Sequence, residues 1–111
     1  MLVCTTGCDW NHTNKCHCQV IAGDVRDATR LQYAMADVDM VIHAAAMKHV
    51  DVVEYNPFEA VKTNVLGTQH VIQTAIDAGV DRALLTSSDK AVDPANTVGT
   101  TKLLAERPAC A

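Results

Sequence analysis

The sequence predicts an α/β domain in which a parallel sheet is covered by helices. Three observations support this prediction. Short apolar runs that suit strands alternate with longer stretches of helical spacing along the chain. These runs lack the apolar–polar alternation of a half-solvated strand, which indicates burial on both faces. Apolar residues make up 49% of the 111 residues and aromatic ones only 4%, which favours an Ala-, Val- and Leu-rich α/β packing over a β-sandwich.

The first half of the domain predicts a strand, a helix and a second strand. Residues 20–25 form a short, β-branched apolar run closed by polar residues, as in a buried strand. Helical spacing follows over residues 29–36, where Leu31 and Met35 are among the apolar positions. Residues 40–46 predict the next strand, and the small residues at its end let a ligand approach the backbone closely.

The second half repeats the alternation. A loop through residues 48–56 precedes Pro57, which suits the first turn of a helix because its missing N–H has no helical partner there. The amphipathic pattern that follows ends at Gly79, a typical residue after a helix C-terminus. Residues 82–87 predict a third strand, and residues 99–107 predict a further helix that Pro108 stops. Such alternation predicts a parallel sheet with right-handed crossovers.

Composition divides the chain into an irregular leader over residues 1–19, a domain over residues 20–107 and a tail over residues 108–111. Four of the five cysteines lie in the leader. Cys4, Cys8, His12 and Cys16 recur at every fourth residue, which would place them along one helix face. Four ligands in one row cannot surround a single zinc ion, so we expect no metal and keep a zinc-binding leader as the alternative.

Charge and hydropathy exclude other classes of partner. The net charge is −4 and the basic residues are scattered singly, so the basic stripe that nucleic-acid binding requires is missing. The longest apolar run, residues 40–47, is far shorter than the roughly 20 residues of a membrane-spanning helix. No export signal is visible, so we expect a cytoplasmic protein without disulfides.

Polar side chains end the predicted strands and mark a candidate site. Asp24, His43 and the run Ser87-Ser88-Asp89 all fall at strand carboxyl ends, where ligands bind in open parallel sheets. Lys102 stands four residues after Val98, on the same face of its predicted helix. Asp89 and Lys90 are the nearest candidates for a catalytic acid and base.

Each candidate also has a structural interpretation. Asp24 suits a helix cap or a bond within its own turn, and residues 87–90 suit a polar loop after a strand. His43, in an apolar strand, is more often a hydrogen-bonded core residue than a catalyst. Asn64 is a poor helix former within a predicted helix, which indicates a tertiary hydrogen bond.

Four ordered motifs carry a resemblance to a known family. They are Gly-Asp-Val-Arg-Asp at residues 23–27, His-Ala-Ala-Ala-Met-Lys-His-Val at 43–50, the Asn-Pro and Asn-Val-Leu-Gly segments within 54–68, and Ser-Ser-Asp-Lys-Ala-Val at 87–92. Over residues 20–107 the chain resembles the nucleotide-sugar 4,6-dehydratases, especially UDP-N-acetylglucosamine 4,6-dehydratase of polysaccharide and flagellin-glycan synthesis. These enzymes belong to the extended short-chain dehydrogenases/reductases. The resemblance implies a partial Rossmann-type sheet with flanking helices.

The resemblance also implies a UDP-sugar substrate and a bound NADP or NAD that takes hydride from sugar C4 and returns it to C6 after water is lost. A homo-oligomer is compatible with it. Ser88 would lie near the sugar, Asp89 would protonate the departing C6 hydroxyl, and Lys90 would abstract the C5 proton. The remaining positions would contact the cofactor: Asp24 and Val25 at the adenine, Ala44, Ala45 and Ala46 at the diphosphate and ribose, Asn64 in the helix behind, and Lys102, also a catalytic candidate, at the nicotinamide ribose.

Three departures from the family pattern define the expected function. Val98 stands where many relatives carry a tyrosine, although some carry methionine. The five glycines, Gly7, Gly23, Gly67, Gly79 and Gly99, form no Gly-rich phosphate-binding turn, so the first βαβ unit is missing. The family's further sugar-binding region is also missing. We therefore expect a dehydratase fragment that is inactive as this chain alone, with a nucleotide-binding or complementing module, or a sugar epimerase, as alternatives.

Overall fold

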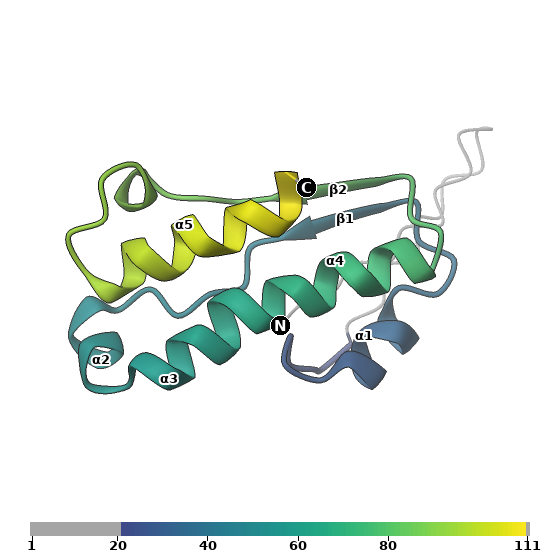
Figure 1. Cartoon of the computed structure of the whole chain (residues 1–111). Coiled ribbons are helices and arrows are strands. Elements are labelled where there is room, and N and C mark those ends of the chain that lie inside the picture. Colours follow the sequence, from purple (N-terminus) through teal and green to yellow (C-terminus); the bar gives the residue numbers. More distant parts are fainter. Residues whose placement is uncertain (1–20, 111) are drawn as a thin grey trace, which may run out of the picture.

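The structure of the protein is a computed structural model that describes residues 21–110. Its two strands, β1 (Met40–His43) and β2 (Arg82–Leu85), are parallel and pair in register, with Ile42 opposite Leu84. Figure 1 shows the strands side by side with the helices alongside them. The helical elements, in chain order, are α1 (Ala28–Ala34), α2 (Val50–Tyr55), α3 (Pro57–Ala60), the π-helical segment η1 (Val61–Leu66), α4 (Gly67–Asp77), the 3₁₀ turn η2 (Asp89–Ala91) and α5 (Thr97–Cys110).

The expected α/β class, parallel pairing and helical crossover are confirmed. The predicted helix over residues 29–36 corresponds to α1, which Asp27 caps by accepting a hydrogen bond from the Arg30 N–H at 3.1 Å. The predicted helix over residues 57–79 corresponds to α3, η1 and α4, which follow one another without a break. Gly79 adopts a φ of +72°, so the expected glycine at the helix end is also confirmed.

Several elements differ from the prediction, and among them β2 ends at Leu85 instead of residue 87 and α5 begins at Thr97 instead of residue 99. Residues 21–25 form no strand: Asp24 and Asp27 close a turn, Ile21 is buried, and Val25 packs with Leu31 and Val71. Strand β1 ends at His43, three residues before the predicted end, and beyond it the Met47 backbone hydrogen-bonds to the side chain of Asn64. The helix α5 continues past Pro108, which costs only one backbone bond in the final turn.

The expected loop over residues 48–56 was wrong, because it contains α2. Its sequence is rich in β-branched residues, which have modest helix propensity. Val53 is fully buried and packs with Ala60 and Val98, so tertiary burial outweighs local preference.

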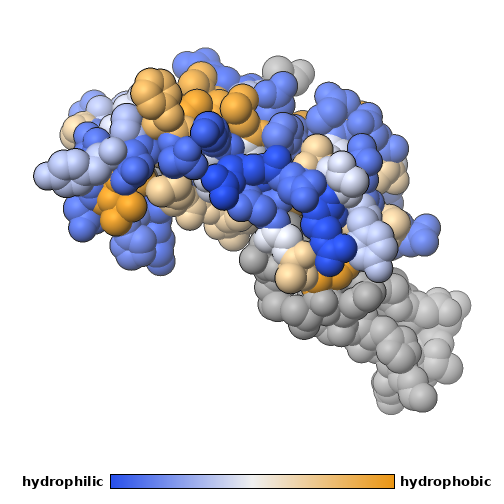
Figure 2. Space-filling model, turned by 90° about the horizontal axis from the view of Figure 1, so that it is seen from below, coloured by the Kyte–Doolittle hydropathy of each residue, from blue (hydrophilic) through white to orange (hydrophobic). Residues whose placement is uncertain are grey.

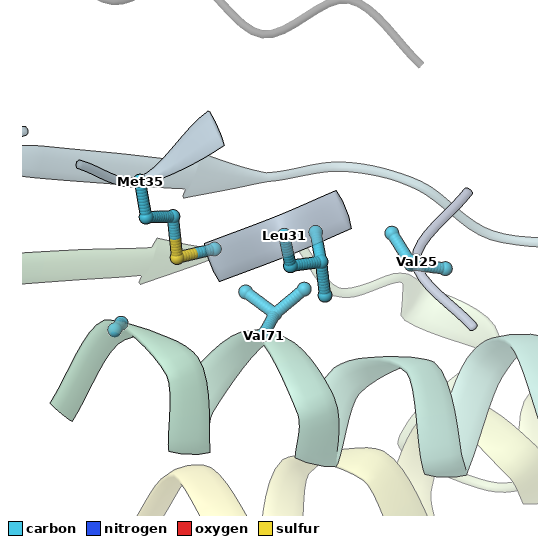
Figure 3. Close-up of a cluster of buried hydrophobic side chains, with 5 residues drawn as sticks. Val25, Leu31, Met35 and Val71 are labelled. Atoms are coloured by element: carbon cyan, nitrogen blue, oxygen red, sulfur yellow. The ribbon is translucent and has the colours of Figure 1, made fainter. Parts of the chain in front are cut away.

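The main hydrophobic core lies between α1, α4 and one face of β1. Figure 3 shows Val25, Leu31 and Met35 pointing toward Val71 of α4. Val41 of β1 packs against this cluster. The opposite face of the sheet is exposed, so the prediction of strands buried on both faces was wrong for the described residues. Ile42 is 64% exposed because no helix among residues 21–110 lies over it.

Hydrophobic and hydrophilic residues are mixed on the surface. Seen from below, hydrophobic residues form separate patches among hydrophilic ones (Figure 2). Within residues 21–110, no helix combines the length and the apolar character that crossing a bilayer requires. The cysteine-rich leader and its zinc alternative lie outside the described residues.

Candidate functional site

Two loops at the carboxyl ends of β1 and β2 form the candidate site. The backbone N–H of Thr86 donates to the carbonyl oxygen of His43 at 3.0 Å, and the Thr86 hydroxyl donates to the same oxygen at 3.2 Å. The two loops are therefore joined by hydrogen bonds at the point where they leave the sheet. This is the edge at which open parallel sheets bind ligands.

The loop after β2 carries three of the four predicted catalytic residues, Ser88, Asp89 and Lys90, in one short turn. The Ser88 hydroxyl accepts a hydrogen bond from the Lys90 N–H at 3.2 Å and donates to Asp89 Oδ1 at 3.2 Å. Asp89 and Lys90 are exposed. Across residues 21–109 the ion pairs involve Arg26, Asp24, Glu59 and Lys62, so neither Asp89 nor Lys90 belongs to one.

Helix α5 places Lys102 beside this loop. Its ammonium donates to the Thr86 carbonyl oxygen at 3.4 Å, and the side chain is partly buried. Burial lowers the pKa of Lys102 from its ordinary value of 10.5, while the charge of Glu106 opposes that change. Glu106 also accepts a hydrogen bond from the Ser87 hydroxyl. The helix thus carries two charged groups that contact the loop.

Val98, one turn before Lys102, is buried at 3% exposure among Val53 and Ala60. Its place in the core agrees with the expectation that this position supplies no proton. Its neighbour Gly99 packs against the loop: a Cβ there would clash with the Lys90 carbonyl oxygen. Only a glycine lets the start of α5 approach η2 so closely.

Asn64 joins the loop after β1 to α5. Its side chain accepts from the Met47 N–H at 2.8 Å and donates to the Met47 carbonyl at 3.2 Å and to the Thr101 hydroxyl at 3.0 Å. The expected tertiary hydrogen bond of Asn64 is therefore confirmed. Because its polar atoms are all engaged and its exposure is 1%, Asn64 supports the loop from behind.

His43 is a hydrogen-bonded core residue, as expected. Its Nε2 lies 3.0 Å from the Thr68 hydroxyl, and the residue is 7% exposed. Burial lowers the pKa of His43 from 6.5, and the positive charge of Lys102 lowers it further. The neutral imidazole is therefore the favoured form in the fold.

The predicted adenine residues lie in a separate network. Asp24 binds its own turn: its carboxylate accepts from the Arg26 N–H at 2.9 Å and from the Arg26 guanidinium at 2.8 Å. These bonds lower the pKa of Asp24 to about 2. The suggested helix cap is instead Asp27. Val25 is 3% exposed with its side chain in the core, and its carbonyl oxygen lies 3.3 Å from His70 Nδ1.

The three alanines after β1 leave their backbone accessible. Ala44 is exposed, and Ala45 and Ala46 are half-buried. Next to them lies a pocket of about 260 Å³ lined by residues from the loop and α2, namely Ala46, Met47, Lys48, His49, Val52 and Val53. The predicted catalytic side chains do not line this pocket.

Sequence reasoning missed several residues that organise the site. Thr68, Thr101 and Glu106 bond to His43, Asn64 and Ser87, respectively. Polar residues at apolar helix positions were the available signal for the two threonines, since buried hydroxyls need partners. Glu106 carries no such signal, because its role depends on the approach of α5 to the loop.

These features define a Rossmann-type α/β segment with a ligand edge at the carboxyl ends of its strands. The profile of the polysaccharide biosynthesis protein family matches residues 6–111, and the chain belongs to this family. A UDP-N-acetylglucosamine 4,6-dehydratase (inverting) from Campylobacter jejuni is 55% identical over 85 residues, which are 77% of this chain and 25% of the relative. An uncharacterized membrane protein from Methanocaldococcus jannaschii is 61% identical over the same length, 77% of this chain and 26% of its own.

Other relatives span the wider superfamily. A UDP-glucose 4-epimerase from Rickettsia massiliae is 46% identical over 80% of this chain and 26% of its own. The solved structure of Pen from Bacillus thuringiensis superposes with a TM-score of 0.78 and 52% identity, over 79% of this chain and 27% of that one. The structure of a dTDP-glucose 4,6-dehydratase from Streptomyces venezuelae with NAD bound superposes with a TM-score of 0.75 and 32% identity, over 78% of this chain and 31% of that one. The chain spans about a quarter of the curated relatives it matches.

Proposed function

We propose that this chain supplies the catalytic loop and part of the cofactor site of a nucleotide-sugar 4,6-dehydratase. The observation that carries the proposal is the η2 turn: Asp89 and Lys90 project from a strand end, outside any ion pair among residues 21–109, with Lys102 beside them. Elimination of water needs one acid and one base on neighbouring atoms, and this turn offers both.

The substrate we propose is UDP-N-acetylglucosamine, the substrate named for the Campylobacter jejuni relative. In the elimination, Lys90 takes the proton from sugar C5, and Asp89 gives a proton to the leaving C6 oxygen. Ser88, bonded to Asp89 Oδ1 at 3.2 Å, orients that carboxyl group and lies near the sugar. The products are an enone sugar and water, so this step is a lyase reaction.

The cofactor we propose is NADP or NAD, which when bound accepts hydride from sugar C4 and returns it to C6. The residues after β1 fit a dinucleotide, because Ala44, Ala45 and Ala46 have no side chain large enough to shield their backbone. Lys102 suits a ribose, since an ammonium donates to hydroxyl oxygens. Asp24 fits less well, because the Arg26 guanidinium already occupies its carboxylate.

Cofactor binding tests this part of the proposal. We expect NADPH or NADH fluorescence to report saturable binding below about 100 μM, equivalent to about −5.5 kcal/mol. Lys102→Ala should weaken it more than Asp24→Ala, because Arg26 already engages the Asp24 carboxylate, whereas Arg107→Ala, at an exposed position of α5, should not weaken it. No binding at millimolar cofactor would remove the cofactor role from this chain.

Turnover separates the alternatives. Binding without dehydration of UDP-N-acetylglucosamine by the chain alone fits our proposal and also a nucleotide-binding module without catalysis. Adding the part of the Campylobacter jejuni dehydratase that lies outside the 85-residue match distinguishes them, because activity that Lys90→Met abolishes requires the η2 turn. Conversion of UDP-glucose to its C4 epimer would instead favour the epimerase alternative, which Asp89 and Lys90 do not favour.

A further inference from the structure

Two charged side chains of α5 contact consecutive residues at the end of β2. Lys102 donates to the Thr86 carbonyl oxygen at 3.4 Å, and Glu106 accepts a hydrogen bond from the Ser87 hydroxyl. Lys102 and Glu106 are four residues apart in the helix, so they lie on the same face of α5. One helix face therefore presents a cation and an anion to the start of the loop that carries the η2 turn.

The two contacted residues connect the sheet to this turn. The Thr86 N–H and hydroxyl both donate to the His43 carbonyl oxygen, which joins the ends of β1 and β2. Ser88 follows directly and accepts a hydrogen bond from the Lys90 N–H at 3.2 Å. The contacts of α5 thus lie along the chain between the end of the sheet and the candidate catalytic turn.

Helix stability does not account for Glu106. An acidic residue four positions after a lysine is the less favourable order for a helical pair, because each charge then lies toward the helix end whose dipole disfavours it. Both side chains are also half-buried, although charged residues are mostly exposed in folded proteins. The contact with the loop, and not the helix itself, is therefore the feature that Glu106 serves.

The charge of Glu106 also acts on Lys102. Burial lowers the pKa of Lys102, and the negative charge of Glu106 opposes that change. Lys102 belongs to none of the ion pairs among residues 21–109, so this attraction acts without direct pairing. The other titratable groups beside it are Asp89 and Lys90 of η2 and His43 of β1. His43 is neutral above its own lowered pKa, so it supplies no negative charge to the ammonium.

We propose that Glu106 is a positioning residue of the candidate site, a role that rests on the proposed contact of Lys102 with the cofactor. Its carboxylate fixes the Ser87 hydroxyl and favours the charged form of Lys102. The ammonium then has hydrogens to donate both to the end of β2 and to the hydroxyl oxygens of a ribose. Glu106 itself touches neither the cofactor nor the sugar.

Titration of Lys102 tests the charge of Glu106. NMR of the isotope-labelled full chain follows the Lys102 Cε resonance from about pH 7 to 11. We expect the Lys102 pKa to fall in Glu106→Gln, which keeps an acceptor for Ser87 but loses the charge, and to recover in Glu106→Asp. Asp93→Asn, at an exposed position before α5, removes the same charge elsewhere and should leave the Lys102 pKa at the wild-type value. A purely structural role predicts no change in Glu106→Gln, because glutamine has the same shape.

Hydrogen exchange tests the contact with Ser87. In Glu106→Ala the amides of residues 86–88 should exchange about threefold to tenfold faster, as expected for loss of one hydrogen bond. In Glu106→Gln they should exchange at the wild-type rate. Circular dichroism spectra that match the wild type show that each variant is folded.

Three results would overturn the proposal. One is an unchanged Lys102 pKa in Glu106→Gln, another is an equal shift in Asp93→Asn, and the third is wild-type exchange of residues 86–88 in Glu106→Ala. NADPH binding is measured separately: where the wild type binds, affinity should decline at lower pH in Glu106→Gln. If the wild type binds no cofactor while the Lys102 pKa still falls in Glu106→Gln, the coupling of the two residues is confirmed and the cofactor role is removed from this chain.

Discussion

The side-chain amide of Asn64 satisfies both backbone polar groups of Met47. Oδ1 accepts from the Met47 N–H at 2.8 Å, and Nδ2 donates to the Met47 carbonyl at 3.2 Å. An asparagine side chain thus replaces the neighbouring strand that the chain would otherwise need after β1. Asn64 lies in the π-helical segment η1, a wider turn that often occurs at functional sites.

Asn64→Ala should destabilise the fold by about 2–4 kcal/mol, because it leaves the Met47 backbone and the Thr101 hydroxyl without their buried partner. Urea unfolding followed by far-ultraviolet circular dichroism measures the change. Gln69→Ala, at an exposed position of the neighbouring helix α4, should stay within about 0.5 kcal/mol of wild type. Equal effects of the two substitutions would refute a bridging role for Asn64.

Much of this arrangement could be predicted from local sequence. Pro57 and Gly79 act through backbone geometry, so they marked the start of α3 and the residue that follows α4. The valine at position 98 could be read directly as lacking a proton donor. A helix-disfavouring Asn64 likewise indicated a tertiary bond, although its partners could not be named.

The rest depends on contacts between distant residues. α2 forms because Val53 reaches a core with Ala60 and Val98, which no local pattern over residues 50–55 reveals. The apolar run of β1 indicated burial on both faces, but burial of Ile42 requires a covering element that residues 21–110 do not contain. The contact of Ser87 with Glu106 depends on how α5 meets the loop.

Stability should fall as the pH drops below about 6.5, the ordinary pKa of histidine. The pKa of His43 is lowered in the fold, first by burial and then by the charge of Lys102, so the unfolded chain binds more protons in that range. The urea midpoint of wild type should decline between about pH 6.5 and 5. In His43→Gln the decline should be shallower.

The titration of Asp24 does not contribute to the expected change in stability between about pH 6.5 and 5. Its pKa is about 2 in the fold against an ordinary 3.8, so its contribution is fully present above 3.8 and is lost only as the pH falls toward 2. A pH profile of His43→Gln as steep as that of wild type would show that other groups cause the decline.

Gly99→Ala should destabilise the chain and loosen the η2 turn. The added methyl meets the Lys90 carbonyl oxygen and lies 3.2 Å from the Pro94 Cα, both backbone atoms that cannot rotate away. We expect a net loss of about 1–3 kcal/mol from overpacking, despite the better helix propensity of alanine. Amide hydrogen exchange should accelerate at residues 88–91. If the amides of residues 88–91 exchange at the wild-type rate in Gly99→Ala, the packing of α5 does not stabilise this turn.

Gly67 and Val25 offer a direct test of how α4 packs on the turn before α1. A Cβ at Gly67 would lie 2.7 Å from Val25 Cγ2, and Gly67 has an ordinary helical φ of −61°, so the substitution meets a steric obstacle and no backbone strain. Gly67→Ala alone should therefore cost about 1–3 kcal/mol.

In a Val25→Ala background the obstructing Cγ2 is absent, and the same change should become neutral or stabilising by about 1 kcal/mol, the helix-propensity difference between glycine and alanine. Urea unfolding of the wild type, both single variants and the double variant completes the cycle. Additive effects would mean that Val25 moves aside when Gly67 gains a methyl group. Because His70 Nδ1 also donates to the Val25 carbonyl oxygen at 3.3 Å, we expect that backbone to resist such a shift and the coupling to be large.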